Sequence, residues 1–250
     1  MRGGGDNGPS RTDCRTAIER YMPELTTVYD RLVAVAGGSD RAARFLSTWC
    51  PPTYLGGCSL AAIASKKHVP LVRNYDLSPE LNEGLLLRTQ WLGRPVMGMV
   101  EFLWGLSDGI NDAGLSVALA YGGRSETGVG FGITTIVRYV LETCNTVDDA
   151  LAVLDRVPSH MAYNLVLADA SGRTASVEMA PGGGMTKMPL AVATNHQGGA
   201  PAADRPTFTR TFELRSHLEK LQIKPRKLNR QFLKAPLLQD RYSKGETPNV

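Results

Sequence analysis

The sequence predicts an α+β protein in which sheets are layered with helices. Segments with the period of strands lie on both sides of a central pair of helical segments, and further helical segments follow them. This order suits layered sheets better than a parallel sheet built from alternating strands and helices. With 250 residues, of which 42% are hydrophobic and 21% charged, the chain is large enough to bury the core of one globular domain.

The first part of the chain is expected to be helical and to end in a loop. Apolar residues recur at helical spacing over Thr12–Val35, with an interruption at Pro23. Asp40–Trp49 predicts a second, short helix, and the next residues, CPPTYLGGC, have the prolines and glycines of an irregular segment. We therefore expect a helical leader or pro-segment over residues 1–57, followed by a domain over 58–250.

After the leader, the hydrophobic period becomes that of strands. Cys58–Ile63 and Val69–Asn74 predict a hairpin, and Leu85–Trp91 predicts a second hairpin with Pro95–Phe102. Further strands are expected at Leu115–Tyr121, Tyr163–Ala168, Ala175–Met179 and Leu190–Thr194. Helices are expected at Ile133–Cys144, Val147–Leu154, Leu214–Leu221 and Leu228–Leu233. Thr146 and Asp149 have the spacing of a capping box at the start of the second of these helices.

Charge and cysteine spacing exclude several classes of function. The four cysteines are widely spaced, without a CxxC pair or a histidine at metal-ligand spacing, which argues against a disulfide framework or a metal site. They are Cys14, Cys50, Cys58 and Cys144. Free thiols indicate a reducing compartment, and the N-terminus lacks the apolar run of a signal peptide. A cytoplasmic protein without a membrane partner is expected.

The net charge of +4 is only mildly basic. Positive residues gather near the C-terminus, where we interpret them as the solvated face of a helix. They are Lys220, Lys224, Arg226, Lys227, Arg230 and Lys234. Binding to nucleic acid is therefore not expected, because it needs a clustered basic face.

Cys58 is the candidate nucleophile, and Gly57-Cys58 is a candidate site of self-cleavage. Cleavage there would give Cys58 a thiol and a free α-amine, whose pKa of roughly 7.7–8.0 suits a base near neutral pH. Gly57 has no side chain to block attack on its carbonyl. Alone, the triplet GGC is weak evidence and favours a buried cysteine at the start of a strand.

Arg73 and Asp76 follow in the segment PLVRNYD, at the end of the second strand of the first hairpin. The hairpin would place them beside Cys58. We expect Arg73 to lower the pKa of the thiol and Asp76 to hold the α-amine. The alternative is an ordinary salt bridge at the end of a sheet.

Four motifs in a fixed order resemble one enzyme group. They are Cys58, R-x-x-D at 73–76, G-I-N-D-A-G-L at 109–115 and A-T-N-H at 193–196. This set resembles the choloylglycine hydrolase and isopenicillin N acyltransferase group of N-terminal-nucleophile hydrolases, above all its bacterial, autoproteolytic, acyltransferase-like branch. The resemblance extends over residues 20–241. It implies a four-layer αββα sandwich and no cofactor.

The resemblance also implies roles for single residues. The terminal Cys58 is nucleophile and base, and Arg73 and Asp76 frame it. Asn195 supplies an oxyanion donor, although an asparagine after a strand is also a common turn residue. A further arginine completes the site. We place it at Arg210, with Arg205 and Arg215 as alternatives.

Two further positions belong to this resemblance. Asn111, in GINDAGL, is expected to order a turn through its side chain. Bile-salt-cleaving relatives carry an asparagine where this chain has Tyr121, so an oxyanion or substrate contact there would come from a hydroxyl or backbone group.

The resemblance fades at Gly245, before the final residues ETPNV, whereas relatives continue into further strands. A C-terminally truncated chain with an incomplete sheet would be expected to associate, for example as a homo-oligomer.

These observations predict a self-processing cysteine amidohydrolase or acyltransferase. Its substrate would be a small molecule with a linear, non-peptide C–N amide, and the intermediate an acyl thioester. One alternative is a conventional Cys-His protease that uses His68, His160, His196 or His217. The other is an uncleaved, inactive scaffold that binds partners.

Overall fold

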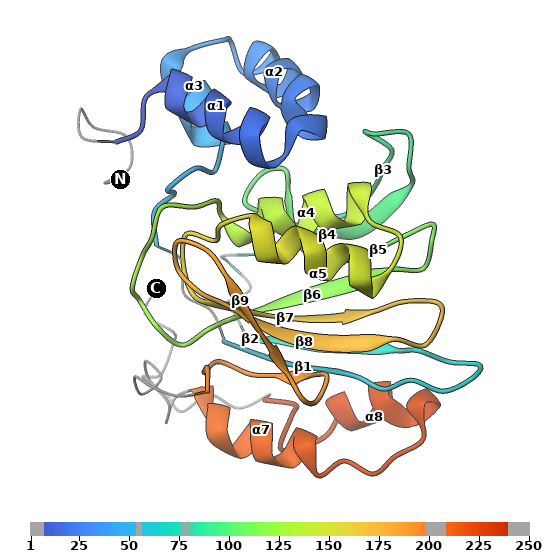
Figure 1. The fold of residues 1–250 in the computed structure, drawn as a ribbon. Helices are drawn as coiled ribbons and strands as arrows, with labels where there is room; N and C mark the ends of the chain where they lie inside the picture. The colour runs from blue at the N-terminus through green and yellow to red at the C-terminus, as the bar shows by residue number, and fades with distance from the viewer. Residues whose placement is uncertain (1–7, 54–56, 77–79, 81, 199–208, 240–250) are drawn as a thin grey trace.

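The computed structural model describes residues 8–53, 57–76, 80, 82–198 and 209–239. Below the N-terminal helices, the elements stack in four layers (Figure 1). Helices α4 (Ile133–Thr143) and α5 (Val147–Arg156) lie on a large sheet, a small sheet lies beneath it, and helices α7 (Thr211–Glu219) and α8 (Leu228–Phe232) cover the far side. This arrangement confirms the expected α+β class and the αββα order of layers.

Both sheets are antiparallel. The large sheet has seven strands in the order β3-β4-β5-β6-β7-β8-β9, and the small sheet has three in the order β10-β1-β2. The strands of the large sheet are β3 (Leu86–Thr89), β4 (Val96–Glu101), β5 (Gly105–Asn111), β6 (Ser116–Tyr121), β7 (Tyr163–Ala168), β8 (Thr174–Met179) and β9 (Met185–Met188). Those of the small sheet are β1 (Gly57–Ala62), β2 (Leu71–Asp76) and β10 (Val192–Ala193).

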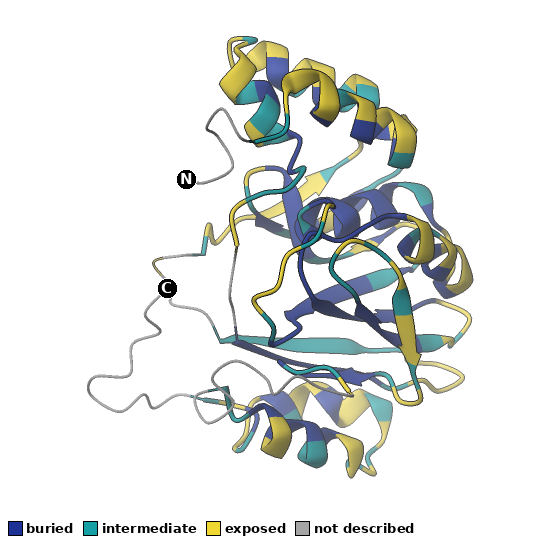
Figure 2. Cartoon of the chain, turned by 60° about the vertical axis from the view of Figure 1, so that its left-hand side comes forward, coloured by how far each residue is buried: buried dark blue, intermediate teal, exposed yellow. Residues whose placement is uncertain are grey.

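Small side chains bring the two sheets together. Ala118, Ala120 and Ala168 of the large sheet pack against residues of the small sheet, which are Cys58, Leu60, Ala62 and Ala193. All six residues of β1 are buried, whereas β2 is half-buried (Figure 2). Cys58 therefore lies in the interior, between the sheets.

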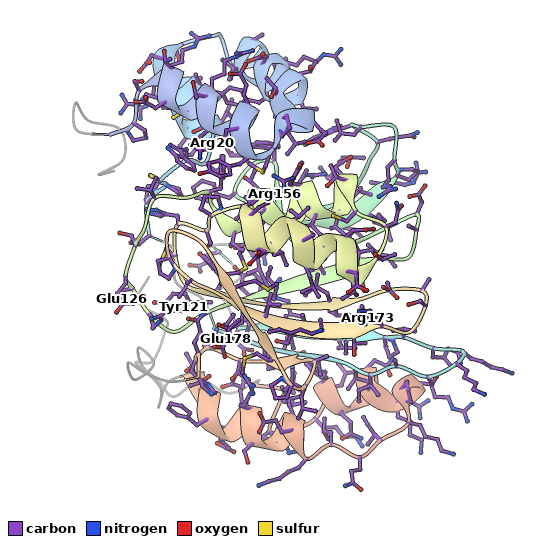
Figure 3. The ribbon with its side chains drawn as sticks, viewed as in Figure 1. Arg20, Tyr121, Glu126, Arg156, Arg173 and Glu178 are labelled. Carbon is purple, nitrogen blue, oxygen red and sulfur yellow. The ribbon has the colours of Figure 1, made fainter. Side chains whose placement is uncertain are left out.

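Three helices form the N-terminal leader: α1 (Arg11–Tyr21), α2 (Thr26–Val35) and α3 (Asp40–Leu46). The interruption expected at Pro23 is a short 3-10 turn over Pro23–Leu25. Ile18, Met22 and Leu25 share one hydrophobic core with α4 and the large sheet. Arg156 in α5, labelled in Figure 3, donates to the carbonyl of Tyr21. The leader is thus packed onto the layer of α4 and α5.

The third leader helix ends earlier than predicted. It ends at Leu46 rather than at Trp49, because Thr48 and Cys50 both have a φ of 51°, which is incompatible with a right-handed helix. Trp49 instead packs against Phe131, with 4.6 Å between the ring centroids.

The sequence missed two strands, β5 and β9. The sequence of β5, GLSDGIN, has two glycines and an aspartate and no alternation of apolar residues. The glycines are needed for close strand pairing: a Cβ at Gly109 would lie 2.7 Å from the carbonyl oxygen of Met97. Both predicted hairpins formed, and the capping box of Thr146 and Asp149 is present.

The small sheet covers only part of the large one. Met97 and Ile110 pair across β4 and β5 and are 44% and 42% exposed. Within the described residues β2 has only β1 as a neighbour and is an edge strand. The segment ETPNV lies outside the described residues, so an incomplete sheet and homo-oligomer formation stay predictions.

Two further observations bear on partners. The six clustered basic residues of the C-terminal region are all exposed, as expected of a solvated face. None of the helices in the described part of the chain has the length and apolarity to span a membrane.

Candidate active site

Cys58 is the second residue of β1 and lies between its neighbours β2 and β10. Its backbone N–H donates a 2.6 Å hydrogen bond to Oδ1 of Asn195. Its thiol is 3.6 Å from Nη2 of Arg73, which donates to the sulfur. In the uncleaved chain this N–H belongs to the Gly57-Cys58 peptide bond. The structure therefore joins three residues that the sequence proposed for one site.

Arg73 reaches the thiol because of the strand register. It pairs with Leu60, and Cys58 pairs with Tyr75, so the side chains of Arg73 and Tyr75 extend from β2 on the same face. The guanidinium lies 3.9 Å from the centre of the Tyr75 ring. Its Nη1 donates to Asp108 on β5 at 2.9 Å. Arg73 thus links the nucleophile to the large sheet.

The electrostatics of the thiol differ from the expectation. Burial raises the pKa of Cys58 to about 11. Arg73 lowers the pKa as predicted, but its effect is smaller than that of burial, and Asp76 and Glu101 oppose it. The expected effect of Arg73 is therefore present in the uncleaved chain, where burial outweighs it.

Arg73 itself stays charged. Burial tends to lower the pKa of its guanidinium, but Cys58, Asp108 and Glu101 raise the pKa above its ordinary value. A fixed positive charge therefore lies beside the sulfur.

Asp76 lies opposite Gly57 in the register, on the other face of β2 from Arg73. Its carboxylate accepts a 3.0 Å hydrogen bond from Nε2 of Gln239. Burial raises the pKa of Asp76 to about 6, although Gln239 and Arg73 lower it. A Cβ on Gly57 would lie 2.9 Å from the carbonyl oxygen of Asp76. Asp76 therefore packs against the residue before the nucleophile, not against the thiol.

Asn195 follows β10 and is buried. While its Oδ1 accepts from Cys58, its Nδ2 donates to the backbone carbonyl of Tyr121 at 3.0 Å. These two bonds fix the orientation of the amide. The neighbouring Asn164 donates to the carbonyls of Thr194 and His196, which holds the segment in place.

Tyr121 reaches the site through its backbone. Its ring packs edge-on against Tyr163, with centroids 6.2 Å apart, and it is buried in the core cluster that includes α4. Figure 3 shows Tyr121 near Glu178, at one end of the large sheet. The carbonyl accepts from Asn195 and cannot donate to an oxyanion, so an oxyanion or substrate contact from Tyr121 stays a prediction.

The arginine at position 210 is not brought to Cys58. It precedes α7 with a φ of 49°, is half-buried and pairs with Glu213 at 2.5 Å. Arg215 is buried and donates to Glu219 at 2.7 Å. The other alternative, Arg205, lies outside the described residues. In the uncleaved chain the Arg210 side chain turns to a carboxylate on the helix that follows it, and its role at the site stays a prediction.

The histidines have other partners. His196 bonds the hydroxyl of Thr211 at 2.8 Å, and His160 bonds the carbonyl of Gly128 at 2.5 Å. Burial lowers the pKa of both rings. In the part of the chain that the structure describes, no histidine bonds the Cys58 thiol and no three metal-ligating side chains are grouped. Asn111 orders its turn as expected, since its Oδ1 accepts from the N–H of Ala113 and Leu115.

Sequence reasoning missed three residues of the site: Tyr75, Glu101 and Asp108. Glu101 is the last residue of β4, is 6% exposed and accepts a 2.8 Å hydrogen bond from the hydroxyl of Tyr75. Asp108 lies on β5, which the sequence did not predict. Tyr75 stands inside the segment PLVRNYD and could have been found from its position opposite Cys58.

Two cavities lie beside this site. A small one, of about 30 Å³, is lined by Glu101, Tyr163 and Met161 and by Pro51 and Pro52 of the leader. A larger one, of about 540 Å³, shares the two prolines and extends below α3. The segment before the candidate cleavage bond thus borders the space next to Glu101.

Comparisons with known proteins identify a family. The family model described as acyl-coenzyme A:6-aminopenicillanic acid acyl-transferase matches residues 64–234. The match begins after Cys58 and includes Arg73, Asp76 and Asn195. No curated protein matches the chain.

Among solved structures, a mutant conjugated bile acid hydrolase from Clostridium perfringens is 16% identical, with a TM-score of 0.40 over 62% of this chain and 56% of that chain. Penicillin V acylase from Agrobacterium tumefaciens is 21% identical, with a TM-score of 0.32 over 56% of this chain and 44% of that chain. The chain therefore spans about half the length of these structures.

Proposed function

The chain belongs to the acyl-coenzyme A:6-aminopenicillanic acid acyl-transferase family, and on this premise we propose that it is an N-terminal cysteine hydrolase or acyltransferase that processes itself at Gly57-Cys58. The substrate class is a small molecule with a linear C–N amide outside a peptide chain. In this proposal residues 1–57 are the pro-segment and residues 58–250 the catalytic domain. Cys58, Arg73, Asp76 and Asn195 carry the chemistry.

One observation supports this proposal most directly. The nitrogen of the candidate scissile bond is held by Asn195 at 2.6 Å, while the sulfur of the same residue lies 3.6 Å from the Arg73 guanidinium. Nucleophile and target bond are thus held together by Arg73 from β2 and by Asn195 from the segment after β10. A cysteine that was only a core residue would need neither contact.

In the processing step, Sγ of Cys58 attacks the carbonyl carbon of Gly57. The new S–C bond replaces the C–N bond, and the proton of the thiol ends on the nitrogen, which becomes the α-amine. Water then hydrolyses the thioester, which frees the Gly57 carboxylate and the Cys58 thiol. Asp76, which packs against Gly57, is proposed to hold the new α-amine.

In turnover, the α-amine takes the thiol proton as sulfur attacks the substrate carbonyl. The substrate amine leaves with that proton, and water or a second amine releases the acyl group. The Asn195 amide has two N–H groups, one of which donates to Tyr121. We propose the other as the oxyanion donor, with Arg73 keeping the sulfur anionic during attack.

The compartment follows from the thiols. All four cysteines are free in the structure. Three of them are buried, and a free-thiol protein of this kind suits a reducing compartment. We therefore propose a cytoplasmic enzyme made as a zymogen.

The test is the intact mass of the purified protein, beside Cys58→Ala as its matched control. Wild type should give two fragments with a new N-terminus at Cys58, without added protease, and Cys58→Ala should stay one chain of 27.0 kDa. Cys58→Ser should cleave slowly, because a hydroxyl is the poorer nucleophile. Cleavage of Cys58→Ala at the same bond would exclude self-processing. A wild type that stays whole and inactive would favour the scaffold alternative, with which the buried, neutral thiol also agrees.

A further inference from the structure

Glu101 is a buried carboxylate beside the nucleophile that the proposed mechanism does not use. It ends β4, on the opposite sheet from Cys58, and is 6% exposed. Its Oε1 accepts a hydrogen bond from the hydroxyl of Tyr75 at 2.8 Å. A carboxylate in such a place costs free energy to desolvate, so its local contacts must compensate.

Those contacts lead directly to the sulfur. Tyr75 stands opposite Cys58 in the β1–β2 register, and its ring carries the Arg73 guanidinium at 3.9 Å. The same guanidinium donates to the thiol at 3.6 Å. Glu101 thus fixes the Tyr75 ring, and this ring packs against the Arg73 guanidinium that donates to the thiol.

Charged and titratable groups on four strands lie around the thiol, with Asp76 on the other face of β2 from Arg73. Strand β2 contributes Arg73 and Asp76, and β4 contributes Glu101. Asp108 on β5 binds Arg73, and the hydroxyl of Tyr163 on β7 is electrostatically linked to both Glu101 and Cys58. Arg73 favours the thiolate, whereas Asp76 and Glu101 oppose it.

We propose that Glu101 is a positioning residue for Cys58: it fixes Tyr75 and through it Arg73 against the sulfur, while its negative charge opposes the thiolate. This inference rests on the proposed function, in which Cys58 is the nucleophile. Its two parts act in opposite directions: the hydrogen bond to Tyr75 aids the thiolate, and the charge resists it.

Two substitutions separate these parts. Glu101→Gln keeps an oxygen that can accept from Tyr75 and removes the charge. It should lower the apparent pKa of Cys58 by ~1 unit, the low end of the effect of a nearby charge. Tyr75→Phe keeps the ring and removes the hydroxyl, so the ring under Arg73 is no longer anchored. It should leave the charge in place and raise the apparent pKa.

The measurement is the rate of alkylation by iodoacetamide as a function of pH. Digestion with trypsin gives residues 45–66 as one peptide from uncleaved chains, whereas a cleaved chain gives a peptide that begins at Cys58. Fragmentation separates Cys50 from Cys58 in the longer peptide. The uncleaved pool can therefore be read by itself, whether or not the protein processes or turns over any amide.

The pH profile is more informative than a single rate. A tenfold gain in thiolate would raise the rate only about threefold, because a thiolate of lower pKa is also a weaker nucleophile. The apparent pKa is read from the position of the pH profile, so the weaker nucleophilicity of the thiolate does not affect it.

Cys144 serves as the internal control. It is as buried as Cys58, at 2% exposure, and burial likewise raises its pKa to about 11. Shifts of opposite sign at Cys58, with Cys144 unchanged, would support the proposal. Shifts of the same sign in both variants, or an equal change at Cys144, would overturn it. If Glu101→Gln does not fold, an unshifted Cys58 in Tyr75→Phe would overturn the positioning role.

Discussion

Two buried arginines of this protein are built alike and surrounded differently. Arg138 in α4 lies over the ring of Trp91 at 4.2 Å, and Arg73 in β2 lies over the ring of Tyr75 at 3.9 Å. Each pairs with a carboxylate: Arg138 with Glu142 at 3.4 Å, and Arg73 with Asp108 at 2.9 Å.

The two arginines differ in the partners of their other N–H groups. Those of Arg138 go to the carbonyl of Trp104 and the hydroxyl of Thr89, and burial lowers its pKa to about 10. Arg73 instead donates to the thiol of Cys58. A buried arginine with permanent partners joins elements of the fold, whereas one with an ionisable partner can change that partner's chemistry. Two other pairs show the same contrast between a site residue and a structural residue: Asn195 with Asn111, and Asp76 with Asp149. Each pair can be tested by substitution.

The largest expected effect comes from the two arginines. Arg73→Ala should abolish processing and turnover and leave the fold largely intact, since the partner it abandons, Asp108, is 30% exposed. Arg138→Ala leaves Glu142 buried and uncompensated and should cost ~3–5 kcal/mol of unfolding free energy. Intact mass and urea unfolding measure the two effects. Normal processing of Arg73→Ala would remove it from the site.

The two asparagines should differ by rate. Asn195→Ala should lower the turnover rate by roughly 10²–10³, as for a lost oxyanion donor. Asn111 is equally buried, but its amide donates to the carbonyls of Leu141 and Cys144. Asn111→Ala should therefore cost ~1–3 kcal/mol of stability with little change in rate. A rate loss in Asn111→Ala alone would contradict the assignment.

The smallest effect is on stability as a function of pH. The folded-state pKa of Asp76 is raised from 3.8 to about 6, so folded protein binds the proton more tightly and stability falls as pH rises over that window. Asp76→Asn should remove this fall and increase the Tm at pH 7, while it stops processing.

The pKa of Asp149 is shifted in the opposite direction from that of Asp76. Its capping-box bonds lower its pKa, so Asp149→Asn should reduce the Tm above pH 4, and the loss should shrink as the pH falls below that value. Thermal unfolding from pH 3 to pH 8 measures both variants. A lower Tm for Asp76→Asn at pH 7 would show that the Asp76 carboxylate stabilises the fold at that pH, which contradicts the prediction that it destabilises the fold.

Local patterns predicted much of this molecule. Period-2 runs and turn residues gave both hairpins, and the first of these already places Arg73 and Asn74 across from β1. The residues that the sequence missed depend on pairing between distant segments. Asp108 needed β5, whose two glycines hide it from a hydrophobic pattern, and Glu101 needed the packing of one sheet on the other.

The placement of Arg210 depends on a local choice of partner that the sequence also left open. Position along the chain favoured it, but a side chain can choose a partner on its own helix, here Glu213. The lowering effect of Arg73 on the Cys58 pKa could be predicted because a nearby cation is visible in a sequence, but the larger opposite effect of burial could not.

The glycine before Cys58 has a consequence for how this sequence can drift over generations. A Cβ at Gly57 would lie 2.9 Å from the Asp76 carbonyl oxygen and 3.2 Å from the Asp76 Cβ, whereas a Cβ at Gly198 would meet no atom nearer than 3.9 Å. Strand pairing alone therefore selects against a side chain at position 57, whether or not the bond is cut. A descendant that had lost its activity would keep the glycine at position 57 for as long as it kept this sheet, whereas Cys58 would be free to change.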